Sequence, residues 1–372
     1  MSEQIPETMP AMVLTGHGGL DKLEYHADWP VPSPAAGEAL VRVKACGLNN
    51  TDINTRIAWY STAVTEGTTE EGGTEGFQDV STDLNTWGGS GIAFPRIQGA
   101  DLCGEVVALG AETPRSLLGR RVLIDPWLRD WSEPLSLDKC GYFGSERDGG
   151  FAAYTTGPVT NIHPVDSDLS DAELATFATS YVTAENMLVQ ARVNEGDTVL
   201  ITGASGGVGS ALVQLVRRRG AHPIAMCGES KKQQVKEIGA EVVLPREASD
   251  LRGLLKAHIN DTHVDVVADV VGGPMWGQFI DAIRRGGTYT CAGAIAGPIV
   301  ELDLRKFYLN NLSFTGATIT PPGLFAELVG YIERGEIRPL LSETWPLESL
   351  RDAQRSFMQK RHIGKLVAVI DR

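Results

Sequence analysis

Short apolar and polar runs alternate along the first third of the chain and are interrupted by Gly and Pro. The run EALVRVKACG (38–47) is typical, and GADLCGEVVALG (99–110) continues the pattern. Alternation with a period of two, bounded by turn residues, indicates antiparallel strands with one buried face. We therefore expect a small all-β unit in this part of the chain.

From about Ser170 the pattern changes to alternating helices and strands. DAELATFATSYVTAENMLVQA (171–191) predicts a helix, DTVLITG (197–203) a buried strand, and GVGSALVQLVRRRG (207–220) an amphipathic helix. The alternation then continues as HPIAMC (222–227, strand), SKKQQVKEIG (230–239, helix), VDVVADVVGG (264–273, strand), WGQFIDAIRRGG (276–287, helix) and TYTCAGA (288–294, strand). Repeated strand, helix and strand specify a doubly wound parallel sheet. A helix at LRDAQRSFMQKRHIG (350–364) and a strand at KLVAVID (365–371) close the chain.

Residues 57–95 break the first pattern, because they are rich in Gly, Thr and Ser and carry six carboxylates but no Lys or Arg. Loops of this length inside a compact domain are uncommon and are often functional. Two interpretations stay open, a solvated acidic excursion and a lid over a substrate. Five aromatic residues favour partial packing, namely Trp59, Tyr60, Phe77, Trp87 and Phe94.

The segment VLITGASGGVGSALVQL (199–215) fits two motifs. One is the strained G-x-S-x-G turn of a serine nucleophile at Ser205, which also needs an acid and a late histidine such as Asp269 and His362. The other is a glycine at every third position, which brings backbone N–H groups against a cofactor pyrophosphate. A second strand ends at Gly228, nineteen positions after Gly209, where the adenosine ribose is expected. The dinucleotide site is favoured, with contacts from Gly203, Ala204, Ser205, Gly206, Gly207 and Val208.

The end of that second strand predicts which nicotinamide cofactor binds. NAD sites usually place a carboxylate there, which accepts hydrogen bonds from the ribose and repels a 2′-phosphate. Here the position is Gly228, followed by Glu229, Ser230, Lys231 and Lys232. The glycine leaves room for the phosphate, and the serine and lysines supply a donor and positive charge. NADP(H) is therefore favoured, although Glu229 points the other way and both lysines can instead belong simply to a helix start.

Composition narrows the function further. The chain has 372 residues, enough for two domains, and a formal net charge of −14 that repels phosphate backbones and anionic lipids. Its first residues, MSEQIPETMPAMVL, do not form a signal peptide, and no apolar run reaches the roughly 18 residues of a membrane helix. We expect a cytoplasmic protein that binds neither nucleic acid nor membranes.

Several stretches together resemble the medium-chain dehydrogenase/reductase superfamily: VKACGLNNTDIN, PRIQGADLCGEVVALG, DGGFAAY, YVTAENML, VLITGASGGVGSALVQLVRRRGA, VDVVADVVGG and HIGKLVAVI. The resemblance implies a GroES-like β-barrel catalytic domain at 1–180, with 57–95 as an insertion, a Rossmann domain at 181–317 and a return to the catalytic domain at 318–372. It also implies a homodimer, a contact of Thr183 with the nicotinamide end, and a position for Lys365 near the cofactor phosphates.

The chain departs from this family at the zinc ligands. Zinc alcohol dehydrogenases use a Cys, a His-Glu pair and a second Cys or Asp, because Zn²⁺ takes three protein ligands and one open position. Here these positions hold Asn49, Ala100-Asp101 and Thr179, and only Cys140 lies where the structural zinc lobe has four cysteines. No zinc is expected. Cys46 and Cys103, in apolar strands beside glycine, fit small buried hydrophobes better than ligands.

Without a metal, reduction of a conjugated C=C bond or a quinone is the best matched chemistry, because negative charge spreads into an enolate or phenolate that hydrogen-bond donors can stabilise. NNTDINTRIAWY (49–60) is similar to the corresponding segment of zinc-free enoyl thioester reductases, which implies that Tyr60 donates the proton, Asn49 binds oxygen, Thr51 is a relay and Asp52 orders the loop. Tyr60 as a packing aromatic is the alternative.

These observations predict an NADPH-dependent, zinc-independent oxidoreductase that transfers hydride to a quinone or an α,β-unsaturated carbonyl. Small neutral enones or aromatic quinones suit the nearby tryptophans Trp59, Trp87 and Trp127, and a small aldehyde is a further expected substrate. The alternatives are an alcohol or aldehyde dehydrogenase with an unconventional metal held by Asp52, Asp101, Cys46 or Cys103, a non-catalytic NADPH-binding protein, and a serine hydrolase.

Overall fold

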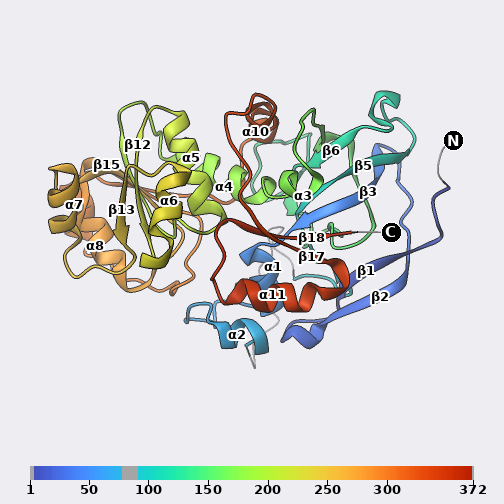
Figure 1. The fold of residues 1–372 in the computed structure, drawn as a ribbon, viewed down its shortest axis with the longest axis horizontal. Coiled ribbons are helices and arrows are strands. Elements are labelled where there is room, and N and C mark those ends of the chain that lie inside the picture. The colour runs from blue at the N-terminus through green and yellow to red at the C-terminus, as the bar shows by residue number, and fades with distance from the viewer. Residues whose placement is uncertain (1–3, 78–90, 371–372) are drawn as a thin grey trace. The chain divides into compact units, whose positions relative to one another are not determined.

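The computed structural model describes residues 4–77 and 91–370, which fold into two compact units (Figure 1). Unit 1 consists of Met1–Val64, Thr69–Thr179 and Phe325–Arg372, and unit 2 of Thr65–Thr68 and Ser180–Leu324. Trp87 lies outside the described residues.

Unit 1 is the β-rich unit that the alternating pattern predicts. Its largest sheet has the strand order β10-β6-β5-β3-β18-β17, with β9 paired to β3, and a smaller sheet has the order β2-β1-β4. The C-terminal strand β18 joins antiparallel to β3, with Val367 opposite Gly47, so the last residues complete the N-terminal sheet. The strands are β1 (Thr8–Leu14), β2 (Leu23–Pro30), β3 (Glu38–Gly47), β4 (Arg96–Ile97), β5 (Asp101–Leu109), β6 (Arg121–Ile124), β7 (Trp127–Arg129), β8 (Cys140–Tyr142), β9 (Tyr154–Pro158), β10 (Ile162–Pro164), β17 (Leu341–Pro346) and β18 (Lys365–Val369).

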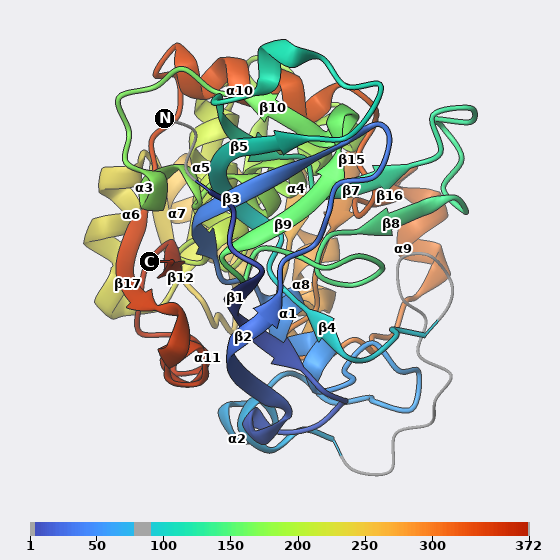
Figure 2. The same ribbon diagram turned by 90° about the vertical axis from the view of Figure 1, so that its right-hand side faces the viewer.

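Short helices surround these sheets. Helix α2 belongs to the acidic insertion and lies against α11 in both ribbon views (Figures 1 and 2). The helices of unit 1 are α1 (Asn50–Arg56), α2 (Glu70–Glu75), α3 (Asp171–Leu174), α10 (Leu324–Glu333) and α11 (Leu350–Met358), and α4 (Ala178–Gln190) runs on into unit 2.

Unit 2 contains the doubly wound parallel sheet, with the strand order β13-β12-β11-β14-β15-β16. Helices α5 and α6 pack together on one face, and α7 and α8 on the other, as right-handed crossovers require. The elements are β11 (Thr198–Ile201), α5 (Gly207–Arg218), β12 (His222–Cys227), α6 (Lys232–Ile238), β13 (Val242–Pro245), α7 (Leu251–Ile259), β14 (Val264–Asp269), α8 (Trp276–Asp281), β15 (Ile283–Cys291), α9 (Leu304–Leu309) and β16 (Ser313–Gly316).

Two predicted helices were too long. The single helix expected over 171–191 is two helices, because the Thr176 hydroxyl donates to the Glu173 carbonyl at 2.7 Å and ends the first helix after one turn. The helix expected over 276–287 ends at Asp281, and the following residues open strand β15, whose Ile283 pairs with Val264. Tertiary pairing therefore overrides the local helical pattern there.

The core of unit 2 lies between the sheet and helices α7 and α8. Its buried residues come from the strands, such as Leu200, Met226 and Val267, and from Leu255 and Phe279 on the helices. Because these residues fill the sheet interior, the strand ends and their loops are left to carry polar function.

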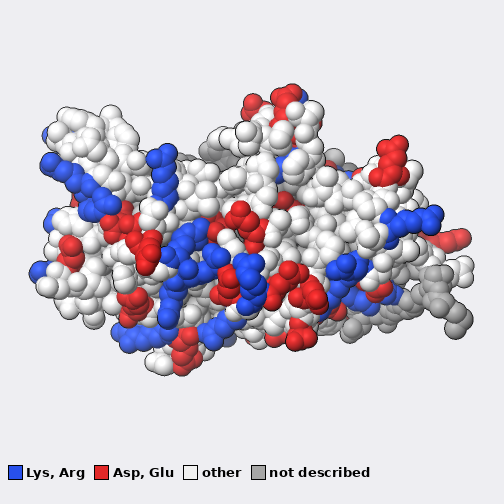
Figure 3. Space-filling view, turned by 90° about the horizontal axis from the view of Figure 1, so that it is seen from above, with Lys and Arg blue, Asp and Glu red and all other residues white. Residues whose placement is uncertain are grey.

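No helix among the described residues is long and apolar enough to cross a membrane. The face shown in Figure 3 carries Lys and Arg side chains interspersed with Asp and Glu, despite the net charge of −14. A cytoplasmic location and the absence of nucleic-acid and membrane partners stay predictions.

Candidate active site and cofactor turn

The first helix of unit 1 positions two of the predicted catalytic residues. Strand β3 ends at Gly47, and α1 begins at Asn50 with Asn49 as its N-cap residue. The buried Asp52 carboxylate accepts a hydrogen bond from the Asn49 backbone N–H at 2.7 Å. This bond satisfies a backbone donor at the helix start and fixes Asn49 at the end of the strand.

A buried lysine occupies the space beside Asn49. The Lys365 ammonium Nζ lies 2.5 Å from Asn49 Oδ1 and 2.8 Å from Asp101 Oδ2. The other oxygen of Asp101 accepts the Thr179 backbone N–H at 2.6 Å. Lys365 and Asp101 form an ion pair away from solvent, with side-chain exposures of 3% and 0%. This arrangement engages the ammonium within unit 1, and the position of Lys365 near the cofactor phosphates stays a prediction.

Two tyrosines lie in the same electrostatic environment. The Tyr60 hydroxyl is hydrogen-bonded to the side chains of Thr51 and Asn54, and burial raises its pKa above the ordinary value, with a further contribution from the Asp52 charge. The Tyr142 hydroxyl lies 2.7 Å from Thr179 Oγ1, and burial together with the charge of Asp101 raises its pKa well above the ordinary value. Both phenols therefore stay protonated and can donate hydrogen bonds at neutral pH.

The predicted tryptophans pack against these phenols. Trp59 makes an edge contact with Tyr60, with ring centroids 5.6 Å apart, and the buried Trp127 makes one with Tyr142 at 4.9 Å. Trp127 was predicted to contact the substrate. In the structure its ring packs against Tyr142.

The Asp52 carboxyl is expected to make stability depend on pH. Burial raises its pKa from 3.8 to about 7, opposed by the bond from Asn49 and the charge of Lys365. Because the folded pKa lies above the unfolded one, the resulting stabilisation is complete below about pH 4 and is lost as pH rises through 7. Asp52→Asn, which cannot ionise, should remove this pH dependence, a total loss of unfolding free energy on the order of 4 kcal/mol at about 1.4 kcal/mol per pKa unit.

Urea unfolding of both proteins at pH 4, 6 and 8 measures this effect. Asp28→Asn, on an exposed residue, is the control and should keep the wild-type slope. Parallel pH profiles for wild type and Asp52→Asn would show that Asp52 ionises normally in the folded protein.

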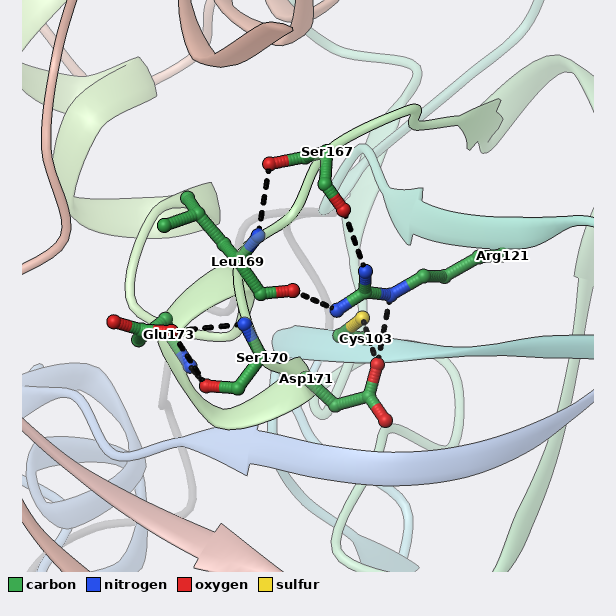
Figure 4. Close-up of polar contacts among 7 residues, drawn as sticks. All are labelled: Cys103, Arg121, Ser167, Leu169, Ser170, Asp171 and Glu173. Atoms are coloured by element: carbon green, nitrogen blue, oxygen red, sulfur yellow. Dashed lines mark hydrogen bonds and ion pairs between the residues drawn. The ribbon is translucent and has the colours of Figure 1, made fainter. Parts of the chain in front are cut away.

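The two cysteines considered as ligands lie in different surroundings. Cys46 is buried near Asp52, Asp101 and Lys365, and burial raises its thiol pKa well above the ordinary value. Cys103 lies instead beside a structural clip at the start of α3 (Figure 4). There the Arg121 guanidinium donates to Asp171 and to the carbonyls of Ser167 and Leu169, and Cys103 Sγ lies 3.6 Å from Asp171 Oδ1. Neither thiol is a reactive thiolate.

The residues at the family's zinc-ligand positions do not fit a zinc ion. Among the described residues, no group of three or more His, Cys, Asp or Glu side chains is arranged to hold a metal. More directly, the lone pairs of Asn49 Oδ1 and Asp101 that would face a cation already face the Lys365 ammonium, and the Thr179 hydroxyl is bonded to Tyr142. A fixed positive charge at this point opposes a divalent cation.

The glycine turn of unit 2 fits a dinucleotide. Gly203 has φ +57° at the end of β11, and α5 begins at Gly207 with its first backbone N–H groups free of intrahelical partners. A Cβ on Gly209 would lie 2.2 Å from the Gly203 carbonyl oxygen, whereas one on Gly206 would meet nothing closer than 3.5 Å. The turn is therefore closely packed at Gly209 and open at Gly206. The open side suits a phosphate on the helix N-terminus.

The residues nominated for a serine hydrolase are arranged differently from a triad. Asp269 is fully buried and accepts hydrogen bonds from the Thr202 hydroxyl at 2.5 Å and the Tyr289 hydroxyl at 2.7 Å. The backbone N–H groups of Val271 and Gly272 donate to the same carboxylate. Asp269 therefore braces the loop after β14 beside the glycine turn, with its oxygens already occupied.

The strand end predicted to hold the ribose has one neighbouring cation, Arg246, that the sequence did not reveal. A Cβ on Gly228 would meet nothing within 4 Å, so the end of β12 is open. Lys231 follows, and burial together with the nearby charge of Arg246 lowers its pKa. Arg246 follows β13, and its backbone N–H donates to the Cys227 carbonyl at 2.9 Å, which places the two strand ends together. Ser230 is exposed, and Lys232 Nζ lies 3.7 Å from Glu229.

Asn49, Thr51 and Tyr60 thus share one part of unit 1, and the predicted phosphate and ribose residues share one edge of the unit 2 sheet. Thr183 lies half-buried on α4, and its contact with the nicotinamide stays a prediction. Sequence reasoning missed roles for Asn54, Tyr142 and Arg246. The Asn54 signal was present, since it belongs to the quoted NTDIN motif, whereas Tyr142 has no local motif.

Comparison with known proteins identifies the family. A family model for the alcohol dehydrogenase GroES-like domain matches residues 35–167, and one for zinc-binding dehydrogenases matches residues 207–334. A crystal structure from Sinorhizobium meliloti 1021 with a provisional alcohol dehydrogenase name is 45% identical, covers 99% of this chain and 98% of its own, and has a TM-score of 0.89. The chain belongs to the medium-chain dehydrogenase/reductase superfamily.

More distant superfamily members differ in their names. Mouse quinone oxidoreductase is 24% identical over 97% of this chain and 98% of its own, and the NAD-dependent alcohol dehydrogenase of Sulfolobus acidocaldarius is 26% identical over 96% and 99%. The protein is therefore an oxidoreductase of this superfamily with the GroES-like and Rossmann-type folds. Family membership overturns the serine hydrolase alternative and leaves Ser205 as a turn residue.

Proposed function

We propose that the protein is a zinc-independent, NADPH-dependent reductase that transfers hydride to a quinone or an α,β-unsaturated carbonyl. The observation that carries this proposal is that one segment of unit 1 holds both the buried Asn49 amide and a half-buried phenol, Tyr60, whose hydroxyl is hydrogen-bonded to Thr51. Asn49 Nδ2 has no hydrogen-bond partner in the described part of the chain. Such an arrangement offers an oxygen-binding donor and a proton donor without a metal.

In this proposal residues of unit 2 bind the cofactor, and residues of unit 1 bind and protonate the substrate. The glycine turn at 203–208 would hold the pyrophosphate of NADPH, which supplies the hydride when bound. The Asn49 amide would bind the substrate oxygen, on which negative charge grows as the hydride reaches the β-carbon. Tyr60 would give its proton to the enolate or phenolate that results, and Thr51 would resupply that proton. Small neutral enones, quinones and aldehydes remain the proposed substrates.

The experiment is NADPH oxidation at 340 nm by chelator-treated protein against matched panels of quinones, enones and simple aldehydes. We expect turnover of enones or quinones that survives chelation and falls about tenfold or more in Tyr60→Phe, the size expected for losing a general acid. Tyr25→Phe, on a side chain that is 43% exposed, is the matched control and should leave turnover unchanged.

Three other results would replace this proposal. Activity confined to aldehydes or alcohols and lost on chelation would indicate a metal-dependent alcohol dehydrogenase. Tight NADPH binding without turnover on any panel would indicate a non-catalytic cofactor-binding protein. Full activity of Tyr60→Phe would leave Tyr60 as a packing aromatic.

Cofactor preference is expected to depend on Lys231 and Arg246. Lys231 and the backbone of Arg246 lie at the open strand end beside Gly228, where a 2′-phosphate would extend from the ribose, and the exposed Arg246 guanidinium, 3.2 Å from Glu247, is close enough to Lys231 to lower its pKa. Lys231→Ala and Arg246→Ala should each raise the KM for NADPH about tenfold, because a charge-assisted hydrogen bond is lost, and should leave the KM for NADH nearly unchanged.

Steady-state kinetics with both cofactors measures this preference, with Lys236→Ala on the exposed side of α6 as a control. Equal losses with NADPH and NADH would show that these cations do not recognise the 2′-phosphate.

Formation of a homodimer stays a prediction.

A further inference from the structure

Asn49 presents a hydrogen-bond donor at the position where zinc-dependent members of the superfamily have a metal ligand. Its side chain is 7% exposed, and Nδ2 has no hydrogen-bond partner among residues 4–77 and 91–370. A buried N–H group without a partner costs about 1–3 kcal/mol. An oxygen of a bound ligand would satisfy it.

Lys365 determines which end of the Asn49 amide is presented. An ammonium has three N–H donors and no acceptor, so it can face only the oxygen of an amide. Lys365 Nζ lies 2.5 Å from Asn49 Oδ1, which leaves Nδ2 for another partner. The Asp52 backbone N–H of the capping box also faces the Asn49 side chain, so without the lysine only that contact would hold the amide in this orientation.

Asp101 holds Lys365 in this position. Its Oδ2 lies 2.8 Å from Lys365 Nζ, and its Oδ1 accepts the Thr179 N–H at 2.6 Å. Lys365 is 2% exposed and Asp101 is fully buried, so moving the ammonium to solvent would leave a buried carboxylate without its counter-ion. The ion pair is therefore a fixed part of the fold.

We propose that Lys365, held by Asp101, is a positioning residue that fixes Asn49 as a donor and so makes this site selective for the oxyanion form of a ligand, an enolate or a phenolate. The site has the opposite polarity from a metal centre, in which lone pairs face a cation. Lys365 acts through Asn49 and does not touch the substrate. The inference rests on the proposed function for the identity of the substrate oxygen.

A chromogenic phenol tests this inference without turnover. 4-Nitrophenol is titrated into the full-length protein saturated with NADP⁺, and absorbance distinguishes bound phenol from bound phenolate across pH. We expect wild type to bind the phenolate preferentially, at least tenfold over the phenol, as charge-assisted bonds predict. Asn49→Asp, which replaces the donor by an acceptor of the same shape, should lose this preference.

The variants of the ion pair then separate positioning from folding. Lys365→Met combined with Asp101→Asn removes both charges together, so no buried charge is left alone, and should reduce the phenolate preference about tenfold while thermal unfolding stays cooperative. Lys365→Arg keeps a cation that has only donors and should therefore retain most of the wild-type preference for phenolate. If the double variant does not fold, loss in Asn49→Asp with retention in Lys365→Arg supports the same inference.

Three results would overturn it: wild type that binds phenol and phenolate equally, a folded double variant with the wild-type preference, or phenolate binding that requires added Zn²⁺. Failure of the proposed function is recognised separately, because it appears as absence of enone and quinone turnover in a protein that still binds the phenolate.

Discussion

Replacing Gly209 by alanine is expected to weaken NADPH binding by more than about 100-fold. The added Cβ would lie 2.2 Å from the Gly203 carbonyl oxygen and 2.7 Å from the Ala204 Cα. Both are backbone atoms of the phosphate-binding turn, so relief requires the turn to move away from α5. Overpacking of this kind costs about 1–3 kcal/mol, and the displaced N–H groups lose their alignment with the pyrophosphate as well.

Isothermal titration with NADPH, together with thermal unfolding, measures both consequences. Gly277→Ala in α8 is the matched control, because a Cβ there would meet nothing within 4 Å and alanine is the better helix former. It should bind NADPH as wild type does and unfold at the same or a higher temperature. Unchanged affinity in Gly209→Ala would mean that the cofactor does not sit on this turn.

The tight contact at Gly209 shows why this part of the fold was predictable. A glycine at every third position is a local signal, and the strand before it and the helix after it are each fixed by their own hydrophobic period. The parallel sheet itself follows from the repetition of strand, helix and strand, and β12 ends at Cys227, beside the position expected for the ribose. Local pattern and tertiary structure agree here.

Residues brought together by non-local pairing could not be predicted in the same way. Thr51 and Tyr60 do not belong to this group, because they are only nine positions apart and one helix with its following turn brings them together. Lys365 reaches Asn49 only because β18 pairs with β3 in a register that sets Val367 opposite Gly47. That register links residues more than 300 positions apart, and nothing in HIGKLVAVI indicates it. The position of Lys365 near the cofactor phosphates came from the family resemblance and stays a prediction, whereas its contacts with Asn49 and Asp101 are seen only in the structure.

Contacts with distant parts of the chain also decide where helices and strands end. The sequence WGQFIDAIRRGG has helical periodicity throughout, but Ile283 is taken up by β15 opposite Val264. The open strand end at Gly228 was recognised from the sequence, and Arg246 was missed because it follows a different strand, β13. Charges that meet across neighbouring strand ends leave no signature within either strand.

Removing the Arg56 side chain is expected to destabilise unit 1 by about 3 kcal/mol or more. Arg56 is fully buried and donates to the carbonyls of Gly18 at 2.8 Å and Gly73 at 2.5 Å, and to Gln354 Oε1 at 3.0 Å. It thereby ties α1 to the turn before β2, to α2 of the acidic insertion, and to α11. Arg56→Met would remove the donor from three acceptors, two of them in buried hydrogen bonds that each cost about 1–3 kcal/mol to lose, offset in part because a buried charge is removed.

Urea unfolding of Arg56→Met and Arg56→Lys distinguishes the guanidinium geometry from its charge. Burial lowers the pKa of Arg56 only to about 10, so the group stays charged at neutral pH. Lysine keeps that charge, but its single nitrogen cannot reach three acceptors that lie in different directions, and we expect Arg56→Lys to recover less than half of the loss. Arg115→Met, on an exposed residue of the same unit, should change stability by less than about 0.5 kcal/mol. A full recovery by lysine would mean that charge alone, and not the fork of hydrogen bonds, holds α2 against α11, and the insertion would then be anchored mainly by the apolar contact between Gly73 and Met358.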